Sequence, residues 1–291
     1  MLNNEKSEMS KLHIHQIFYS EKTRLENDPG FLGLDNLTNL RPDWREYWPI
    51  RNCLLNNKLV ENDYYGFFSP KFKSKTNLNA EDVYSFINAS ADEPDVFLFS
   101  PFFDQAAFCH NIFQQAAAVH DSSSNALAQS AMLIAPSFNI DNIIMDSRNI
   151  VYCNYFVAKP AFWKVWLKSC ELIFTIAEEN TTILGNRLNS LTKHDNGKAP
   201  TKVFIIERVA SLLLSTQKHW KVKAFNPWKL PNANSYAARY PDDLLLMDAL
   251  KIAYNTQGYP EYLSMFTQMQ DSIVAKIALE KKNLSEQASG S

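Results

Sequence analysis

Short apolar runs alternate with longer amphipathic stretches along most of the chain, a pattern typical of strands and helices in turn. Runs rich in β-branched and aromatic residues predict strands at 12–20, 63–68, 95–99 and 149–158. Apolar residues at three- and four-residue spacing predict helices at 41–55, 79–87, 104–119, 124–135, 159–179, 199–215, 240–254 and 259–282. Within the 199–215 segment, the run VFIIE alone would also suit a strand.

This order of elements predicts an α/β fold. Strands separated by helices favour a central, mostly parallel sheet flanked by helices, and the surplus of helices adds a helical C-terminal part. The chain contains neither a repeat nor a low-complexity linker. We therefore expect a single domain over residues 11–283, between disordered tails at 1–10 and 284–291.

Composition narrows the class of protein. Charged residues make up 21% of the chain and the formal charge is −2, which argues against a disordered polyanion or a general nucleic-acid binder. The seven glycines form none of the motifs G-x-G-x-x-G, G-x-x-x-x-G-K-[ST] or G-x-S-x-G. Dinucleotide dehydrogenases, P-loop enzymes and serine hydrolases are thereby disfavoured. Any phosphate must be held locally, by side chains and a helix end.

The spacing of the cysteines and the lack of targeting signals bear on the cellular compartment of the protein. Cys53, Cys109, Cys153 and Cys170 are far apart and form no C-x-x-C pair, as expected of buried free thiols in a reducing environment. The first residues lack the apolar stretch of a signal peptide, and no segment reaches the roughly 18 apolar residues of a membrane span. We expect a cytoplasmic protein.

Three lysines occupy alternate positions in DYYGFFSPKFKSKTNLNAEDV, residues 63–83. In an extended segment, Lys71, Lys73 and Lys75 would share one side and could converge on one anion. Asn79 and Asp82 suit the start of a helix, whose free N–H groups would add to the positive field. The alternative is a solvated, lysine-rich loop.

Five segments in this order carry a family resemblance: LHIHQIFYS, RPDWREYWPIRN, YYGFFSPKFKSKT, YCNYFVAKPAFWKVW and KVFIIERVASLLL. Together they resemble bacterial proteins linked to surface polysaccharides and related to glycosyltransferases of the nucleotide-sugar-binding A-type fold. IHQIFYS resembles the I-H-Q-I-W start of mannosyltransferase-like enzymes. YCNYFVAKPAFW resembles their acceptor-side strand and helix, and VFIIERVASLLL resembles an F-x-x-E-R helix. The resemblance covers roughly residues 11–265.

The resemblance implies a nucleotide-diphospho-sugar transferase-like fold and a glycosyltransferase activity. A sugar would pass from a nucleotide-diphosphate donor to a surface-glycan acceptor, in capsule or lipopolysaccharide biosynthesis. It also leaves open a peripheral contact with the inner membrane face. The oligomeric state is left open.

Donor binding would fall on two groups of residues. Such enzymes place the base beside the tip of the first strand, where this chain has His15, Gln16, Tyr19 and Ser20. The candidate cations for the diphosphate are Lys71, Lys75, Arg41, Arg45 and Arg51. Arg41 and Arg45 share a face if a helix begins that early. Ion pairs of these arginines with Asp43 or Glu46 are the alternative.

Glu207 and Asp243 are the candidate catalytic residues. Glu207 stands between apolar residues, where a carboxylate is unfavourable unless it is paired or lines a cleft. An ion pair with Arg208 is the structural alternative. Asp243 follows a proline and equally suits a helix cap.

Asn154, Lys159 and Trp44 are the candidate acceptor- or sugar-binding residues. Asn154 would be a polar group on a mostly apolar strand face, suited to a sugar hydroxyl or to a structural amide contact.

One motif of such transferases is missing. The chain lacks the aspartate-x-aspartate pair that binds metal and diphosphate, and the nearest candidate ligands are Asp95 and Asp104. A role for Mn²⁺ or Mg²⁺ is therefore open. Two further functions also stay open. One is a non-catalytic relative that binds glycan or nucleotide sugar in polysaccharide assembly, and the other is a metal-dependent hydrolase.

Overall fold

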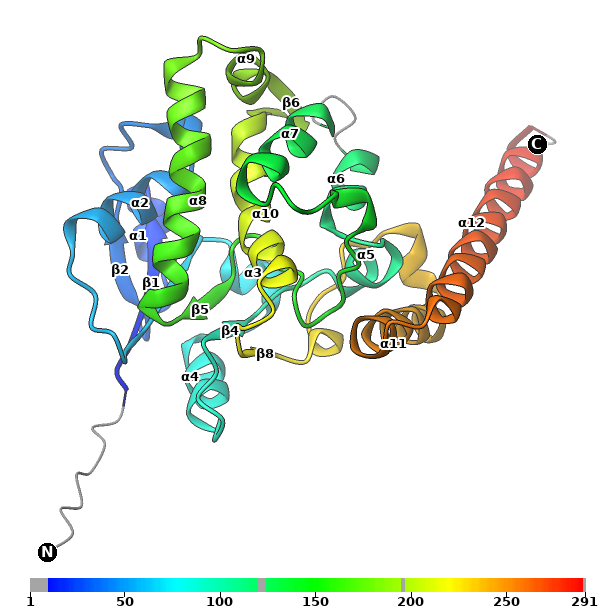
Figure 1. Cartoon of the computed structure of the whole chain (residues 1–291), viewed down its shortest axis with the longest axis horizontal. Helices are drawn as coiled ribbons and strands as arrows, with labels where there is room; N and C mark the ends of the chain where they lie inside the picture. The colour runs from blue at the N-terminus through cyan, green and yellow to red at the C-terminus, as the bar shows by residue number, and fades with distance from the viewer. Residues whose placement is uncertain (1–9, 120–123, 195–196, 290–291) are drawn as a thin grey trace, which may run out of the picture.

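The computed structural model describes residues 10–119, 124–194 and 197–289. A six-stranded sheet in the order β2-β1-β3-β5-β4-β8 lies at its centre (Figure 1). The strands are β1 (Leu12–Phe18), β2 (Leu32–Asp35), β3 (Tyr64–Phe68), β4 (Val96–Leu98), β5 (Phe156–Ala158) and β8 (Val222–Ala224). Only the pairs that include β5 are antiparallel. The predicted α/β class with a mostly parallel sheet is confirmed.

Helices cover the sheet and continue beyond it (Figure 1). In the first half they are α1 (Glu21–Leu25), η1 (Pro42–Trp44), α2 (Tyr47–Asn56), α3 (Phe72–Thr76), α4 (Ala80–Asn88), α5 (Phe103–Phe108), α6 (Ile112–Val119), α7 (Ser124–Ile134) and η3 (Ile140–Asn142). In the second half they are α8 (Pro160–Glu179), α9 (Ile183–Asn189), α10 (Thr201–Thr216), η4 (Pro227–Lys229), η5 (Tyr236–Arg239), α11 (Pro241–Gln257) and α12 (Pro260–Ser289). A hairpin of β6 (Leu191–His194) and β7 (Gly197–Pro200) precedes α10.

The largest core cluster lies between the sheet and helices α8 and α10. Trp163 and Trp166 of α8 are almost completely buried there, beside Phe156 of β5. A second cluster, with Phe68, Phe72 and residues of α4, forms another part of the core. A third cluster joins α5 to α11 and α12. The predicted helical C-terminal part is confirmed, and α12 projects away from the rest of the molecule (Figure 1).

The order of the strands creates a switch point at β1. The chain passes from β1 to its neighbour β2, and then crosses to β3 on the other side of β1. In open α/β sheets, ligands bind in the crevice outside the carboxyl ends of the strands at such a point. The residues that follow β1, β2 and β3 therefore border the expected binding crevice.

The lysine segment is helical, so the prediction of an extended chain was wrong. Phe72 and Thr76 are fully buried one helical turn apart, and this apolar anchoring winds residues 72–76 into α3. Lys71 and Lys75 consequently lie one turn apart on another side, while the exposed Lys73 points elsewhere. The predicted cap of α4 is confirmed, because Asn79 Oδ1 accepts the Asp82 N–H at 2.9 Å. The Ala80 N–H of that helix end is taken by Asp28.

The strand predicted at 149–158 is also shorter than expected. Only β5 is extended, because the N–H groups of Val151 and Tyr152 donate to the hydroxyls of Ser211 and Ser100 instead of a strand partner. Cys153 and Asn154 then adopt left-handed conformations, with φ of 59° and 54°. Asn154 is thus a turn residue and not part of a strand face.

Two predicted helices have different limits. The helix predicted at 41–55 begins only at Tyr47, so Arg41 and Arg45 do not share a helical face. The helix predicted at 104–119 is divided into α5 and α6. The buried Lys251 ammonium binds the carbonyl oxygens of Ala106 and Cys109 at the end of α5, and Asn111 caps the start of α6.

The C-terminal end of the chain also differs from the expectation. Helix α12 continues to Ser289, so residues 284–289 of the expected C-terminal tail are helical. Residues 1–9 of the expected N-terminal tail, and residues 290–291, lie outside the described part. Within the described ranges, no helix has both the length and the apolar composition needed to cross a bilayer.

Candidate functional site

A cleft of about 480 Å³ opens at the carboxyl ends of β1 and β3, at the switch point of the sheet. Its walls come from the end of β1, the loops after β2 and β3, α3, the η1–α2 connection, β7 and α10. The lining residues are Ile17, Tyr19, Asn36, Asn39, Pro42, Arg45, Glu46, Ser69, Lys71, Lys75, Gly197, Lys198 and Glu207. Ligand pockets in proteins are typically about 300–1,000 Å³, so the cleft has the size of a small-molecule site.

A smaller cavity of about 30 Å³ adjoins this cleft, and we call it the inner chamber. It shares Glu46, Ser69, Lys75 and Glu207 with the cleft. Its other lining residues are Trp44, Tyr47, Cys153, Asn154, Val203 and Ile206. The four shared residues therefore stand at the junction between the two spaces.

Four cationic side chains line the cleft: Arg45, Lys71, Lys75 and Lys198. None of them forms an ion pair within 4 Å with a carboxylate in the described residues. Arg45 also has a left-handed φ of 46°, a strained conformation for a residue with a side chain. Because none of these charges is held in an ion pair within 4 Å, these groups can attract an anion into the cleft.

Two carboxylates, Glu46 and Glu207, face the same space. Glu207 is the single residue of α10 between Thr201 and Ser215 that is not buried, so this helix presents one carboxylate to the cleft. Arg208 instead donates to the carbonyl oxygens of Phe204 and Ile112 and to the Gln115 amide. Burial raises the pKa of Glu46, and the negative charge of Glu207 raises this pKa further.

Lys75 and Cys153 meet at the junction. The Lys75 ammonium donates to the Cys153 sulfur at 3.1 Å. Burial raises the pKa of Cys153 to about 11, so the group is a neutral thiol at pH 7. Burial by itself lowers the pKa of Lys75, but Cys153, Glu207 and Glu46 outweigh it and the net shift is upward. At neutral pH the two carboxylates are the groups that favour the charged form of Lys75.

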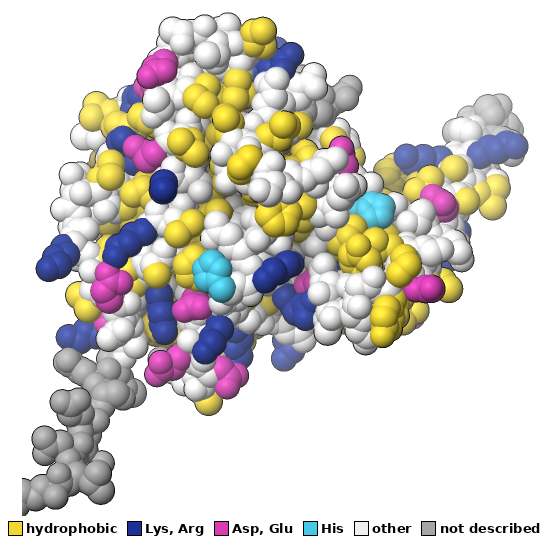
Figure 2. All heavy atoms as spheres, in the orientation of Figure 1, with side chains coloured by type: hydrophobic (Ala, Val, Ile, Leu, Met, Phe, Trp, Pro, Cys, Tyr) yellow, Lys and Arg dark blue, Asp and Glu magenta, His cyan; other side chains and the backbone are white. Residues whose placement is uncertain are grey.

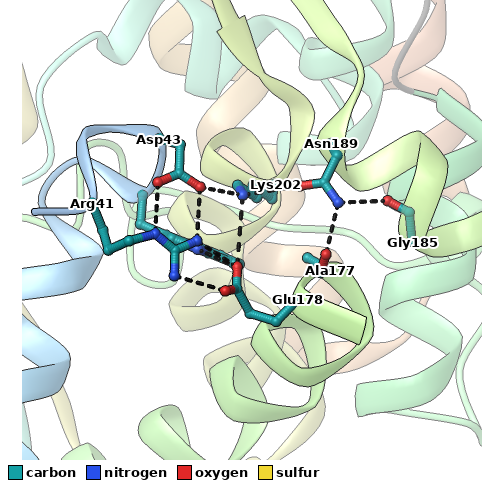
Figure 3. A network of polar contacts seen from close by, with 8 residues as sticks. Arg41, Asp43, Ala177, Glu178, Gly185, Asn189 and Lys202 are labelled. Carbon is teal, nitrogen blue, oxygen red and sulfur yellow. Dashed lines mark hydrogen bonds and ion pairs between the residues drawn. The ribbon is translucent and has the colours of Figure 1, made fainter. Parts of the chain in front are cut away.

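A polar network holds the η1 segment in place beside the cleft (Figure 3). Arg41 binds Asp43 and Glu178 with two hydrogen bonds each, at 2.6–3.0 Å. The buried Lys202 ammonium donates to Asp43 at 2.6 Å and to Asn189 at 2.9 Å. The network fixes the start of the segment that carries Arg45 and Glu46, and it keeps Arg41 away from the cleft.

Arg51 and Trp44 are likewise engaged. Arg51 donates two hydrogen bonds to Glu171, at 2.6 and 2.7 Å, and it does not line the cleft. Trp44 is buried, and its indole N–H donates to Glu178 at 2.9 Å. Trp44 is nevertheless one of the residues that line the inner chamber.

Of the candidates at the end of β1, only Tyr19 lines the cleft, and it is 44% exposed. His15 stacks on Phe67, with ring centroids 5.2 Å apart, and burial lowers its pKa. The Gln16 side chain accepts the Asp28 N–H and is buried. Ser20 caps α1 by accepting the Thr23 N–H. His15, Gln16 and Ser20 therefore make contacts within the fold and do not line the cleft.

The remaining candidates lie away from the cleft. Asp95 precedes β4 and Lys159 follows the antiparallel β5. Both therefore lie at the edge of the sheet opposite to the cleft, where the Lys159 N–H donates to the Asp95 carbonyl oxygen. Lys159 lies over the ring of Tyr64. Asp243, on α11, pairs with Lys276 of α12 at 3.2 Å.

The described residues do not fit a metal ion. The buried Asp104 carboxylate accepts the N–H groups of Ala233 and Ser235, and Asp95 accepts that of Lys221. Both carboxylates therefore accept backbone N–H groups, and neither of them lines the cleft. In the described ranges, no three His, Cys, Asp or Glu side chains gather in a way that could hold a metal.

The structure thus brings Tyr19, Arg45, Lys71, Lys75 and Glu207 together in the cleft, with Trp44 and Asn154 in the adjoining chamber. Sequence reasoning missed Asn36, Asn39, Lys198 and Cys153 as lining residues, and it considered Glu46 only as a partner for arginine. The strained turn at residue 45 leaves no recognisable signal in the local sequence. The hairpin that carries Lys198 does leave one, the Asn-Gly pair at 196–197, which the sequence-based prediction did not use.

The surface charge agrees with a local anion site. On the face drawn in Figure 2, Lys and Arg side chains lie among Asp and Glu side chains and do not form a separate basic field. Comparison of the chain with known protein families, with curated proteins and with solved structures finds no match.

Proposed function

We propose that the protein is a glycosyltransferase that moves a sugar from a nucleotide-diphosphate donor to a glycan hydroxyl. One observation carries this proposal: a cleft at the switch point of the sheet combines four cations without ion-pair partners and two carboxylates. Cations suit the diphosphate of the donor, and a carboxylate suits the hydroxyl that attacks the sugar.

The cleft offers a contact for each part of the donor. The exposed Tyr19 ring suits stacking with the base, and the Asn36 and Asn39 amides suit the ribose and the base edges. Arg45, Lys71 and Lys198 suit the diphosphate, as charge-assisted donors. Lys75, at the junction, would lie between the diphosphate and the sugar.

The reaction needs one proton transfer and one displacement. Glu207 accepts the proton of the acceptor hydroxyl. At the same time, the oxygen of that hydroxyl bonds to the anomeric carbon of the sugar. The bond from this carbon to the diphosphate oxygen breaks, and the electron pair leaves with the diphosphate. Negative charge grows on that leaving group, and the cations of the cleft stabilise it. Glu46 adds a second negative charge near the cationic sugar carbon.

The finer expectations remain part of the proposal. They are a nucleotide-diphospho-sugar transferase-like fold, an acceptor from a bacterial surface glycan, and action in the cytoplasm at the inner membrane face. The parallel strands β1, β2 and β3 beside the cleft support the first of these.

Binding and turnover are tested separately. Thermal unfolding is measured with UDP, GDP and their sugars, since a ligand at a hundred times its dissociation constant adds about 2.7 kcal/mol. Turnover is then followed as nucleoside diphosphate release from the wild type and Glu207→Gln. We expect stabilisation of both proteins and release by the wild type alone. Stabilisation without release by either protein would favour the non-catalytic binding role, and absence of stabilisation would exclude both roles.

A further inference from the structure

The inner chamber is too small for a sugar ring. A single water needs about 10–15 Å³ of such space, so 30 Å³ admits one or two non-hydrogen atoms of a ligand. Its walls are mixed: Trp44, Val203 and Ile206 are apolar, whereas Asn154 and the four residues shared with the cleft are polar. A group that fits must therefore be short, with an apolar part and a polar end.

One polar atom of the chamber lacks a partner. Asn154 is only 7% exposed, and its amide oxygen is buried and accepts no hydrogen bond from the described residues. Two other polar side chains of the chamber have partners: the Ser69 and Tyr155 hydroxyls form a hydrogen bond at 2.6 Å, and the Tyr47 hydroxyl donates to Glu171. A buried acceptor without a donor is unfavourable by about 1–3 kcal/mol. A ligand group that donates a hydrogen bond to this oxygen would therefore be stabilised in the chamber.

The backbone at this point is strained as well. Cys153 and Asn154 are consecutive residues with left-handed φ, although neither is glycine. Such conformations are unfavourable by roughly 1–3 kcal/mol each and cluster at ligand-binding sites, although asparagine tolerates them better than most residues. The strain places the Asn154 side chain in the wall of the chamber.

The charges at the junction decide which donor fits. Glu46, Glu207 and Lys75 border the chamber, and because two carboxylates outnumber one ammonium group, an anionic group is disfavoured there. A neutral hydroxyl can donate to the Asn154 oxygen without this penalty. An adjoining methylene group can pack against Trp44 and Ile206.

We propose that the inner chamber receives the hydroxymethyl arm of the donor sugar, with its hydroxyl donating to Asn154 Oδ1. This inference rests on the proposed function and adds a substrate class: hexoses that keep an oxygen on the sixth carbon. Asn154 is then a residue that determines donor specificity, and it does not take part in the proton transfer.

The test compares pairs of donors by calorimetry. UDP-glucose is compared with UDP-xylose, which lacks the whole arm, and GDP-mannose with GDP-rhamnose, which lacks only its hydroxyl. The wild type should prefer the first member of the pair it binds by about tenfold, the value of one good hydrogen bond. Asn154→Gly suits the left-handed backbone and removes the amide, so this variant should fold and lose the preference.

A matched variant separates the amide from the backbone. Asn180 also has a left-handed φ, 48°, but it is exposed at the end of α8, away from the cleft. Asn180→Gly should therefore keep the tenfold preference. Equal affinity of the wild type for both members of a pair, or an unchanged preference in Asn154→Gly, would overturn the inference alone. If UDP, GDP and all four sugars fail to bind, the proposed function and this inference fall together.

Discussion

The Lys75 ammonium lies 3.1 Å from the Cys153 sulfur, although 78 positions separate the two residues in the chain. The contact joins α3, which follows β3, to the strained turn before β5. It brings a charge toward the inner chamber, where burial alone would disfavour it. The contact therefore links the two parts of the candidate site.

Loss of this charge should make Cys153 less reactive. Burial raises the pKa of Cys153 to about 11 even though the positive charge of Lys75 opposes that shift. Lys75→Met removes the opposing charge, so the thiolate fraction falls and alkylation by iodoacetamide at pH 9 should slow by about tenfold. Mass spectrometry over time measures the rate at each cysteine. Cys53 provides the internal control, and faster alkylation of Cys153 in the variant would contradict the coupling.

Lys71 and Lys73 form a matched pair for testing anion binding. Both belong to the same short segment and have exposed side chains, but only Lys71 lines the cleft. Lys71→Ala should weaken binding of a nucleoside diphosphate by about tenfold, because one charge-assisted contact is lost. Lys73→Ala should leave the affinity unchanged. Calorimetry at two salt concentrations measures both, and equal losses in the two variants would indicate a diffuse charge effect in place of a defined contact.

The network around Lys202 should matter for stability. The Lys202 ammonium is buried, and it binds Asp43 and Asn189 while lying 4.3 Å from the centre of the Trp44 ring. Breaking a fully buried pair costs about 3–5 kcal/mol, but Asp43 is one-third exposed, so Lys202→Met should lose about 2 kcal/mol.

Urea unfolding measures this loss, and an exposed pair supplies the control. Lys164 and Glu61 form an ion pair at the surface, with both side chains more than half exposed. Lys164→Met should change the free energy of unfolding by less than about 1 kcal/mol. Equal effects of the two substitutions would show that the buried network adds nothing beyond a surface pair.

The fold was predictable where the pattern of apolar residues is local and strong. The long helices α8 and α10 have continuous apolar stripes, and β1 and β3 are aromatic or β-branched. Strands β2 and β8 were missed because they lie at the edges of the sheet, where short and partly polar sequences suffice. Their pairing depends on strands far away in the chain, which no local pattern records.

The site was predictable to a smaller extent, for a similar reason. Glu207 is conspicuous as an isolated carboxylate in an apolar helix, and it does line the cleft. Lys71 and Lys75 converge through the spacing of a helix instead of the strand spacing that suggested them. Arg41 and Arg51 were misplaced because their partners, Glu178 and Glu171, lie more than a hundred positions away. Long-range ion pairs cannot be inferred from charge spacing alone.

The carboxylate pair should reveal itself in the pH dependence of stability. Burial and the charge of Glu207 raise the pKa of Glu46 above its ordinary value. For an acid whose pKa rises on folding, the folded state binds more protons, so stability falls as pH rises above the unfolded pKa of about 4.3. Glu46→Gln removes this loss. The variant should be more stable than the wild type at pH 7 by about 0.5–2 kcal/mol, with a smaller gain at pH 4.5.

Urea unfolding at both pH values measures the gain, and two variants show its source. Glu179→Gln removes an exposed carboxylate at the end of α8 and should give little change between the two pH values. Glu207→Gln removes the like charge, so the pKa of Glu46, followed by NMR titration, should fall. A gain in Glu46→Gln that shrinks between pH 4.5 and pH 7 would mean that Glu46 is stabilised in its charged form. The nearby cations would then hold both carboxylates ionised, and like-charge repulsion would not govern the cleft.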